Sequence, residues 1–133
     1  MKRIIPEIYI NNCKVALEYY KEVFGGDIKN VQMADGKEMF KGSEGKVIHS
    51  ELHINDDCVM YLVDILQVEK ESSSTHLVLE LENEEEINKI YQALSKEGSI
   101  KFELQKTFWG ALHAVVTDCY GITWGLNYSN QKT

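Results

Sequence analysis

The sequence predicts an α+β fold in which one β-α-β-β-β module occurs twice in tandem. Hydrophobic residues make up 44% and charged residues 26% of the 133 residues, as in ordinary globular proteins. Segments with the two-residue period of strands and segments with the helical period follow one another in the same order in both halves. A polar, serine-rich stretch at 67–74 separates these halves. We therefore expect a single domain over 1–133, with module one at about 1–66 and module two at about 75–128.

The first module begins with a strand whose Pro6 favours an edge position in the sheet. A helix follows, because apolar residues recur at helical spacing; Asn11 or Asn12 can cap its start and Gly25-Gly26 can end it. A glycine-rich, charged loop at 34–46 precedes two alternating segments joined by a turn. The predicted elements are strand 4–10, helix 13–24, strand 27–34 and a hairpin of 46–54 and 58–65.

The second module repeats this order. Acidic residues open its helix, where they suit the helix dipole, and the turn before Gly121 joins its last two strands. A shift of 71 positions places Ile8 on Leu79, Asn12 on Asn83 and Tyr20 on Tyr91. The predicted elements are strand 75–82, helix 84–97 and strands 100–106, 112–118 and 122–128.

Charge and composition exclude several classes of partner. The net charge of −7 disfavours nucleic acid, because an acidic surface repels phosphate backbones. No apolar run is long enough to span a bilayer, so no membrane association is expected. The first residues lack the apolar core of a signal peptide, and the three cysteines show no CxxC spacing. These features predict a cytoplasmic protein with reduced thiols.

Three polar residues of segment 46–54 form the strongest candidate site. His49, Glu51 and His53 alternate with other residues, so they share one strand face, and Glu7 and Tyr9 share a face of the first strand. Imidazoles and a carboxylate can bind a divalent metal such as Zn, Ni, Mn or Fe. Successive members lie about 7 Å apart along a strand, so one ion is not expected to take all three. A polar cavity wall that makes hydrogen bonds is the alternative interpretation.

Four motifs carry a resemblance to a known family: EYYKEVFGG, GKVIHSELHI, TFWG and DCYGITWGL. They resemble the vicinal oxygen chelate superfamily of glyoxalase I, bleomycin- and fosfomycin-resistance proteins and extradiol dioxygenases, and within it the PhnB-like branch. That branch is often labelled 3-demethylubiquinone-9 3-methyltransferase-like. The resemblance implies that the two modules form a cupped mixed sheet, that the cavity takes a small molecule and that the protein is a homodimer. Methyl transfer is not expected, because no glycine-rich strand-to-helix turn is present.

The resemblance also implies positions for metal ligands. In metal-binding members they lie on the first strand of each module and on the last strand, which correspond here to Ile5, His76 and Gly125. Only His76 can ligate a metal, so a metal site would be degenerate.

Two functions remain open at this point. One is a small-molecule-binding protein of unassigned substrate that binds in a polar cavity. The other is a divalent-metal-dependent lyase, isomerase or transferase of the glyoxalase type, with His76 as a ligand. The residues assigned to acid–base chemistry are Glu51 and His49, and those assigned to ligand contact are Glu7, Tyr9, His53 and Trp109.

Overall fold

The computed structural model describes residues 2–66, 75–107 and 110–129. These residues form the expected strands and helices, with one short 3-10 helix, η1, inside the glycine-rich loop. The first half contains β1 (Glu7–Ile10), α1 (Cys13–Phe24), β2 (Asp27–Met33), η1 (Glu38–Phe40), β3 (Val47–His53) and β4 (Val59–Asp64). The second half contains β5 (Leu77–Glu80), α2 (Glu84–Ser95), β6 (Ser99–Lys106), β7 (Leu112–Thr117) and β8 (Thr123–Tyr128).

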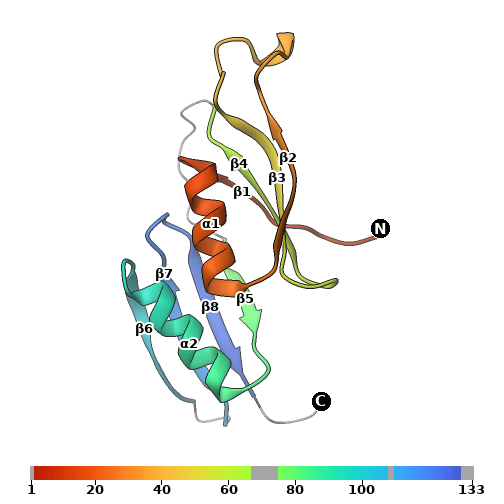
Figure 1. Ribbon diagram of the computed structural model, residues 1–133. Coiled ribbons are helices and arrows are strands. Elements are labelled where there is room, and N and C mark those ends of the chain that lie inside the picture. Colours follow the sequence, from red (N-terminus) through yellow and green to blue (C-terminus); the bar gives the residue numbers. More distant parts are fainter. Residues whose placement is uncertain (1, 67–74, 108–109, 130–133) are drawn as a thin grey trace. The chain divides into compact units, whose positions relative to one another are not determined.

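The chain divides into two compact units, 1–69 and 70–133. Each holds one four-stranded sheet, in the order β1-β4-β3-β2 in the first unit and β5-β8-β7-β6 in the second. In both sheets the first strand runs parallel to its neighbour and the other pairs are antiparallel. Each helix packs against the sheet of its own unit (Figure 1). The tandem β-α-β-β-β architecture is therefore confirmed, whereas a single domain with one shared cup stays a prediction.

The start of α1 is held by a residue far away in the sequence. Asn12 occupies the N-cap position, but its side chain makes no capping hydrogen bond, so the predicted cap is wrong. Instead, the buried Asp64 at the end of β4 accepts hydrogen bonds from the backbone N–H of Cys13 (2.9 Å) and of Val47 (2.7 Å). One carboxylate thus satisfies the starts of both α1 and β3.

The start of α2 follows the local rules that the sequence suggested. The side chain of Asn83 accepts a hydrogen bond from the backbone N–H of Glu86, and the Glu86 carboxylate accepts one from Glu82 N–H. Acidic residues occupy its first turn. This arrangement is a variant of the capping box. Within the described residues, neither helix is long and apolar enough to cross a membrane.

The first strand of each unit is shorter than predicted. β1 begins at Glu7 rather than at residue 4, and β5 begins at Leu77 rather than at residue 75. The ladder with β4 begins at Glu7, although the Pro6 carbonyl still accepts a hydrogen bond from Tyr61 N–H (2.9 Å), and the ladder with β8 begins at Leu77. Ile5 and His76 therefore lie just outside the strands in which they were expected. Pro6 does precede an edge strand, as predicted.

Candidate functional site

β3 presents two different faces. On the face toward α1, Ser50 and Leu52 are fully buried, and the Ser50 hydroxyl lies 3.6 Å from the Cys13 sulfur of α1. On the opposite face the structure brings His49, Glu51 and His53 together, and all three are only partly exposed. We refer to these three residues as the His-Glu-His cluster and to their side of the first sheet as its open face.

The carboxylate of Glu51 lies between the two imidazole rings. Its Oε2 is 2.7 Å from His49 Nε2, and its Oε1 is 2.7 Å from His53 Nε2. The side-chain amide of Asn30, on β2, donates a third hydrogen bond to Oε1 at 3.1 Å. Only 12% of the Glu51 side chain is exposed, so these contacts replace most of its water.

These hydrogen bonds fix the charge of Glu51 and the protonation of its neighbours. The bond from His49, then that from His53, lowers the pKa of Glu51 from 4.5 to about 2, although burial opposes this shift. At neutral pH the carboxylate is therefore ionised, and an ionised carboxylate only accepts hydrogen bonds. Each Nε2 must then carry the proton, which leaves Nδ1 of a neutral imidazole as an acceptor.

This low pKa predicts a specific pH dependence of stability. Because the folded value lies below the ordinary one, the contribution of Glu51 is fully present above about pH 4.5 and is lost as the pH falls through about 2. We expect Glu51→Gln to be less stable than the wild type at neutral pH, with a difference that shrinks between these two values. Urea unfolding of both proteins across this range is the measurement, and a constant difference would contradict the assignment.

Neighbouring strands extend the open face. Glu51 pairs with Tyr61 of β4 and with Lys29 of β2, and Tyr61 pairs with Glu7 of β1, so one row crosses the whole sheet. The Tyr61 ring meets His49 edge-on, with centroids 4.8 Å apart and an interplanar angle of 73°. Tyr9, two residues beyond Glu7, is 60% exposed. The face thus combines acceptors with aromatic surface.

The positions implied for a metal do not supply a ligand set. Ile5 has no donor atom, Gly125 is a buried residue of β8 with no side chain, and His76 is an exposed residue before β5. Within the described ranges, no group of three or more His, Cys, Asp or Glu residues is arranged to hold a metal ion. The residues present therefore do not fit a metal at the positions that the family uses.

The remaining candidate residues belong to the second unit. Trp109 lies outside the described residues. His113 is half-buried on β7 and pairs with Asn127 of β8 and Gln105 of β6. Trp124 of β8 is a fully buried core residue whose indole N–H donates to Asp118.

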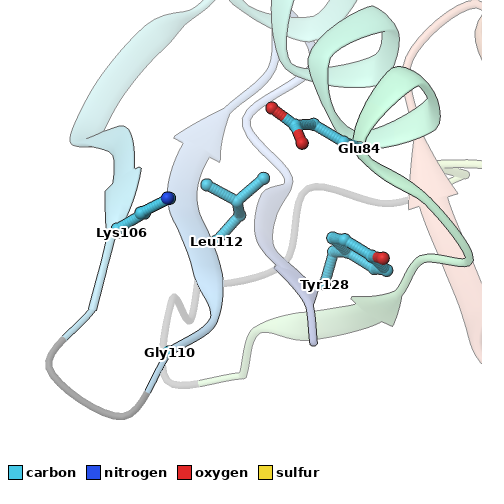
Figure 2. Close-up of a pocket in the computed structure, with 5 residues that line it drawn as sticks. All are labelled: Glu84, Lys106, Gly110, Leu112 and Tyr128. Carbon is cyan, nitrogen blue, oxygen red and sulfur yellow. The ribbon is translucent and has the colours of Figure 1, made fainter. Parts of the chain in front are cut away.

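A small cavity of about 160 Å³ lies in the second unit, where side chains of α2, β6, β7 and β8 meet (Figure 2). None of the predicted site residues that the structure describes lines it; the lining residues are Glu84, Lys106, Gly110, Leu112 and Tyr128. Ligand pockets usually have about 300–1,000 Å³, so this cavity is too small for a typical metabolite.

Sequence reasoning missed two residues of the site. Tyr61 lies in an apolar strand and carried no polar signal. Asn30 could have been noticed in the sequence, because asparagine is disfavoured in strands. Asparagine also tolerates the left-handed conformation that it adopts here (φ 53°).

Two mixed four-stranded sheets, each with its own helix, define the class of glyoxalase-like proteins. The chain belongs to the Glyoxalase/Bleomycin resistance protein/Dioxygenase superfamily, whose model matches residues 4–126. The resemblance to the vicinal oxygen chelate superfamily is thereby confirmed.

Several relatives agree with this assignment. Protein YjdN of Escherichia coli is 25% identical over 93% of this chain and 92% of its own. The solved structure of protein PA1353 from Pseudomonas aeruginosa has a TM-score of 0.84 and 23% identity, over 97% of this chain and 98% of that one. The PhnB protein of Bacillus cereus, which carries the name 3-demethylubiquinone-9 3-methyltransferase, has a TM-score of 0.80 and 22% identity, over 96% and 100%. At these identities the two structures show the fold alone.

Proposed function

We propose that this protein binds a small molecule, without a metal, on the open face of the first sheet around the His-Glu-His cluster. The observation that carries the proposal is the Glu51 carboxylate, which lies 2.7 Å from Nε2 of two imidazoles and belongs to a side chain that is only 12% exposed. Partly buried polar groups arranged this way on a sheet face are typical of ligand sites.

The groups on this face favour a ligand with hydrogen-bond donors. With each Nε2 donating to Glu51, the Nδ1 atoms of His49 and His53 are acceptors, and Glu7 adds an exposed carboxylate. Tyr9 and Tyr61 supply aromatic surface for a flat ligand. The proposed ligand is therefore a small, planar molecule that carries hydroxyl or amino groups, and Trp109 is a further proposed contact.

The cluster can also move a proton. With a pKa of about 2, Glu51 is too weak a base to take a proton at neutral pH. His49 is the better acceptor, through Nδ1, and the carboxylate of Glu51 stabilises the imidazolium that results. In the proposal, His49 is thus the acid–base group and Glu51 holds it in the correct tautomer.

Three simple probes test the proposal. Phenol and benzylamine carry donors on an aromatic ring, whereas benzoate offers only acceptors. We expect phenol and benzylamine to shift the NMR signals of the His49 and His53 rings more than benzoate does, and we expect EDTA to have no effect. Glu51→Gln is expected to weaken phenol binding about tenfold, since a hydrogen bond to a charged group contributes about 1.5–3 kcal/mol.

Two outcomes would count against this function. Equal binding of all three probes by the wild type and Glu51→Gln would exclude the cluster as the site. A divalent metal that co-purifies with the protein, and whose removal abolishes binding, would instead favour the metal-dependent lyase, isomerase or transferase.

A homodimer and a cytoplasmic location complete the proposal. Exposed apolar side chains, such as Val78 on β5 and Phe102 on β6, support association with a second copy. The thiol of Cys58 is exposed, which suits a reducing compartment. Sedimentation at micromolar concentration is expected to give a dimer. Methyl transfer is not included, because the sequence has no glycine-rich strand-to-helix turn.

A further inference from the structure

Asn30 has an unusual backbone conformation beside the candidate site. Among the described non-glycine residues, Asn12 and Asn30 have positive φ, and the φ of Asn30 is 53°. It lies within β2 where the register with β3 slips, between Lys29 and Gln32. Such a conformation is sparsely populated by residues with a side chain and persists where its surroundings maintain it.

The second unit provides an internal comparison. β6 slips against β7 between Phe102 and Gln105, at the same place in the sheet where β2 slips against β3. The two residues inside that slip, Glu103 and Leu104, have no positive φ. A bulge at this place in the fold therefore does not require a left-handed residue.

The two sheets also differ at the residue that Asn30 touches. In the first unit the row Glu7, Tyr61, Glu51 and Lys29 crosses the sheet. The equivalent row in the second unit is Val78, Gly125, Val115 and Phe102. The first unit, which has the Glu51 carboxylate in this row, thus has a left-handed residue at its bulge. The second unit, which has Val115 in place of Glu51, has no left-handed residue at its bulge.

We propose that Asn30 is a positioning residue of the His-Glu-His cluster, whose left-handed backbone directs its amide onto Glu51. Its Nδ2 donates to Oε1, the same oxygen that accepts from His53, while Oε2 accepts from His49. Three donors from two strands then fix the plane of the carboxylate, so that both imidazoles keep Nε2 protonated. For its effect on ligand binding, this inference rests on the proposed function.

Two variants separate the backbone conformation from the amide. Glycine adopts positive φ freely, so Asn30→Gly keeps the bulge and removes only the amide. Aspartate also tolerates this conformation, so Asn30→Asp keeps the shape and puts a like charge where the donor was. Glu103→Gly, at the equivalent bulge of the second unit, is the matched control.

The measurement is the titration of the Glu51 carboxyl by carbon-13 NMR in the free protein. We expect the midpoint of Glu51 to rise in Asn30→Gly, to rise further in Asn30→Asp and to stay unchanged in Glu103→Gly. Phenol affinity should fall about fivefold in Asn30→Gly, the equivalent of one neutral hydrogen bond.

The outcomes distinguish this inference from the proposed function. If the folded Asn30→Gly and Asn30→Asp proteins titrate Glu51 as the wild type does, the positioning role is wrong, whether or not phenol binds. If Glu51 shifts as expected but phenol does not bind even to the wild type, the positioning role is supported and the proposed function is contradicted.

Discussion

Asp118→Ala is expected to lower the free energy of unfolding by about 3–5 kcal/mol, because it removes the acceptor of three hydrogen bonds. Asp118 Oδ1 accepts from the backbone N–H of Tyr120 (2.8 Å) and Ile122 (3.0 Å). Its Oδ2 accepts from the indole N–H of Trp124 at 2.8 Å. Only 4% of Asp118 is exposed, so water cannot readily replace these bonds. Urea unfolding followed by circular dichroism measures the loss.

Asp118→Asn is the matched control for this prediction. The asparagine oxygen can still accept from the two backbone N–H groups. Its NH2 group would face the indole N–H of Trp124, and no hydrogen bond can form there because both groups are donors. We expect a loss of about half that of Asp118→Ala. A loss under about 1 kcal/mol for Asp118→Ala would show that the turn after β7 does not depend on this carboxylate.

Gly26→Ala is also expected to lower the free energy of unfolding strongly, and Gly26 lies beside the candidate site. Gly26 has a φ of +93°, and an added Cβ would lie 2.3 Å from the carbonyl oxygen of His53 and 2.7 Å from the Cα of Ile54. Both atoms belong to the backbone, so the end of β3 would have to move. We expect a loss of about 3 kcal/mol or more in urea unfolding, and altered NMR signals from the His53 ring.

Gly25→Ala controls for the effect of positive φ alone. Gly25 has a φ of +81°, but an added Cβ would meet nothing within 4 Å. Its expected loss is about 1–3 kcal/mol, with no change at the His53 ring. Equal losses for the two variants would contradict the close approach of Gly26 to β3.

The sequence predicted correctly those helix ends that depend on residues nearby in the chain. The apolar spacing of 13–24 and the glycines after it gave the bounds of α1 as observed. The acidic first turn likewise predicted the start of α2, whereas its cap, Asn83, was not predicted. The cap of α1 could not be found this way, because Asp64 lies 51 positions from Cys13. The starts of β1 and β5 also depend on where β4 and β8 pair with them.

Only part of the candidate site could be predicted, because the sequence shows which residues share a strand face but not which contacts they make in the folded protein. Two-residue alternation placed His49, Glu51 and His53 on one strand face, and the structure brings these three side chains together. Alternation could not show that the carboxylate would bridge both rings, since side chains two residues apart can also turn away from each other. Asn30 reaches Glu51 only because β2 is bulged and pairs with β3, which is a tertiary feature.

The proposed site depends on an ionised Glu51 carboxylate that accepts a hydrogen bond from Nε2 of both His49 and His53. Nitrogen-15 NMR of the histidine rings at slightly alkaline pH tests it directly, because it reports which ring nitrogen carries the proton. We expect protonated Nε2 and bare Nδ1 for both His49 and His53 in the wild type, with loss of this preference in Glu51→Gln. Protonated Nδ1 in either ring, or a mixture unaffected by Glu51→Gln, would contradict it.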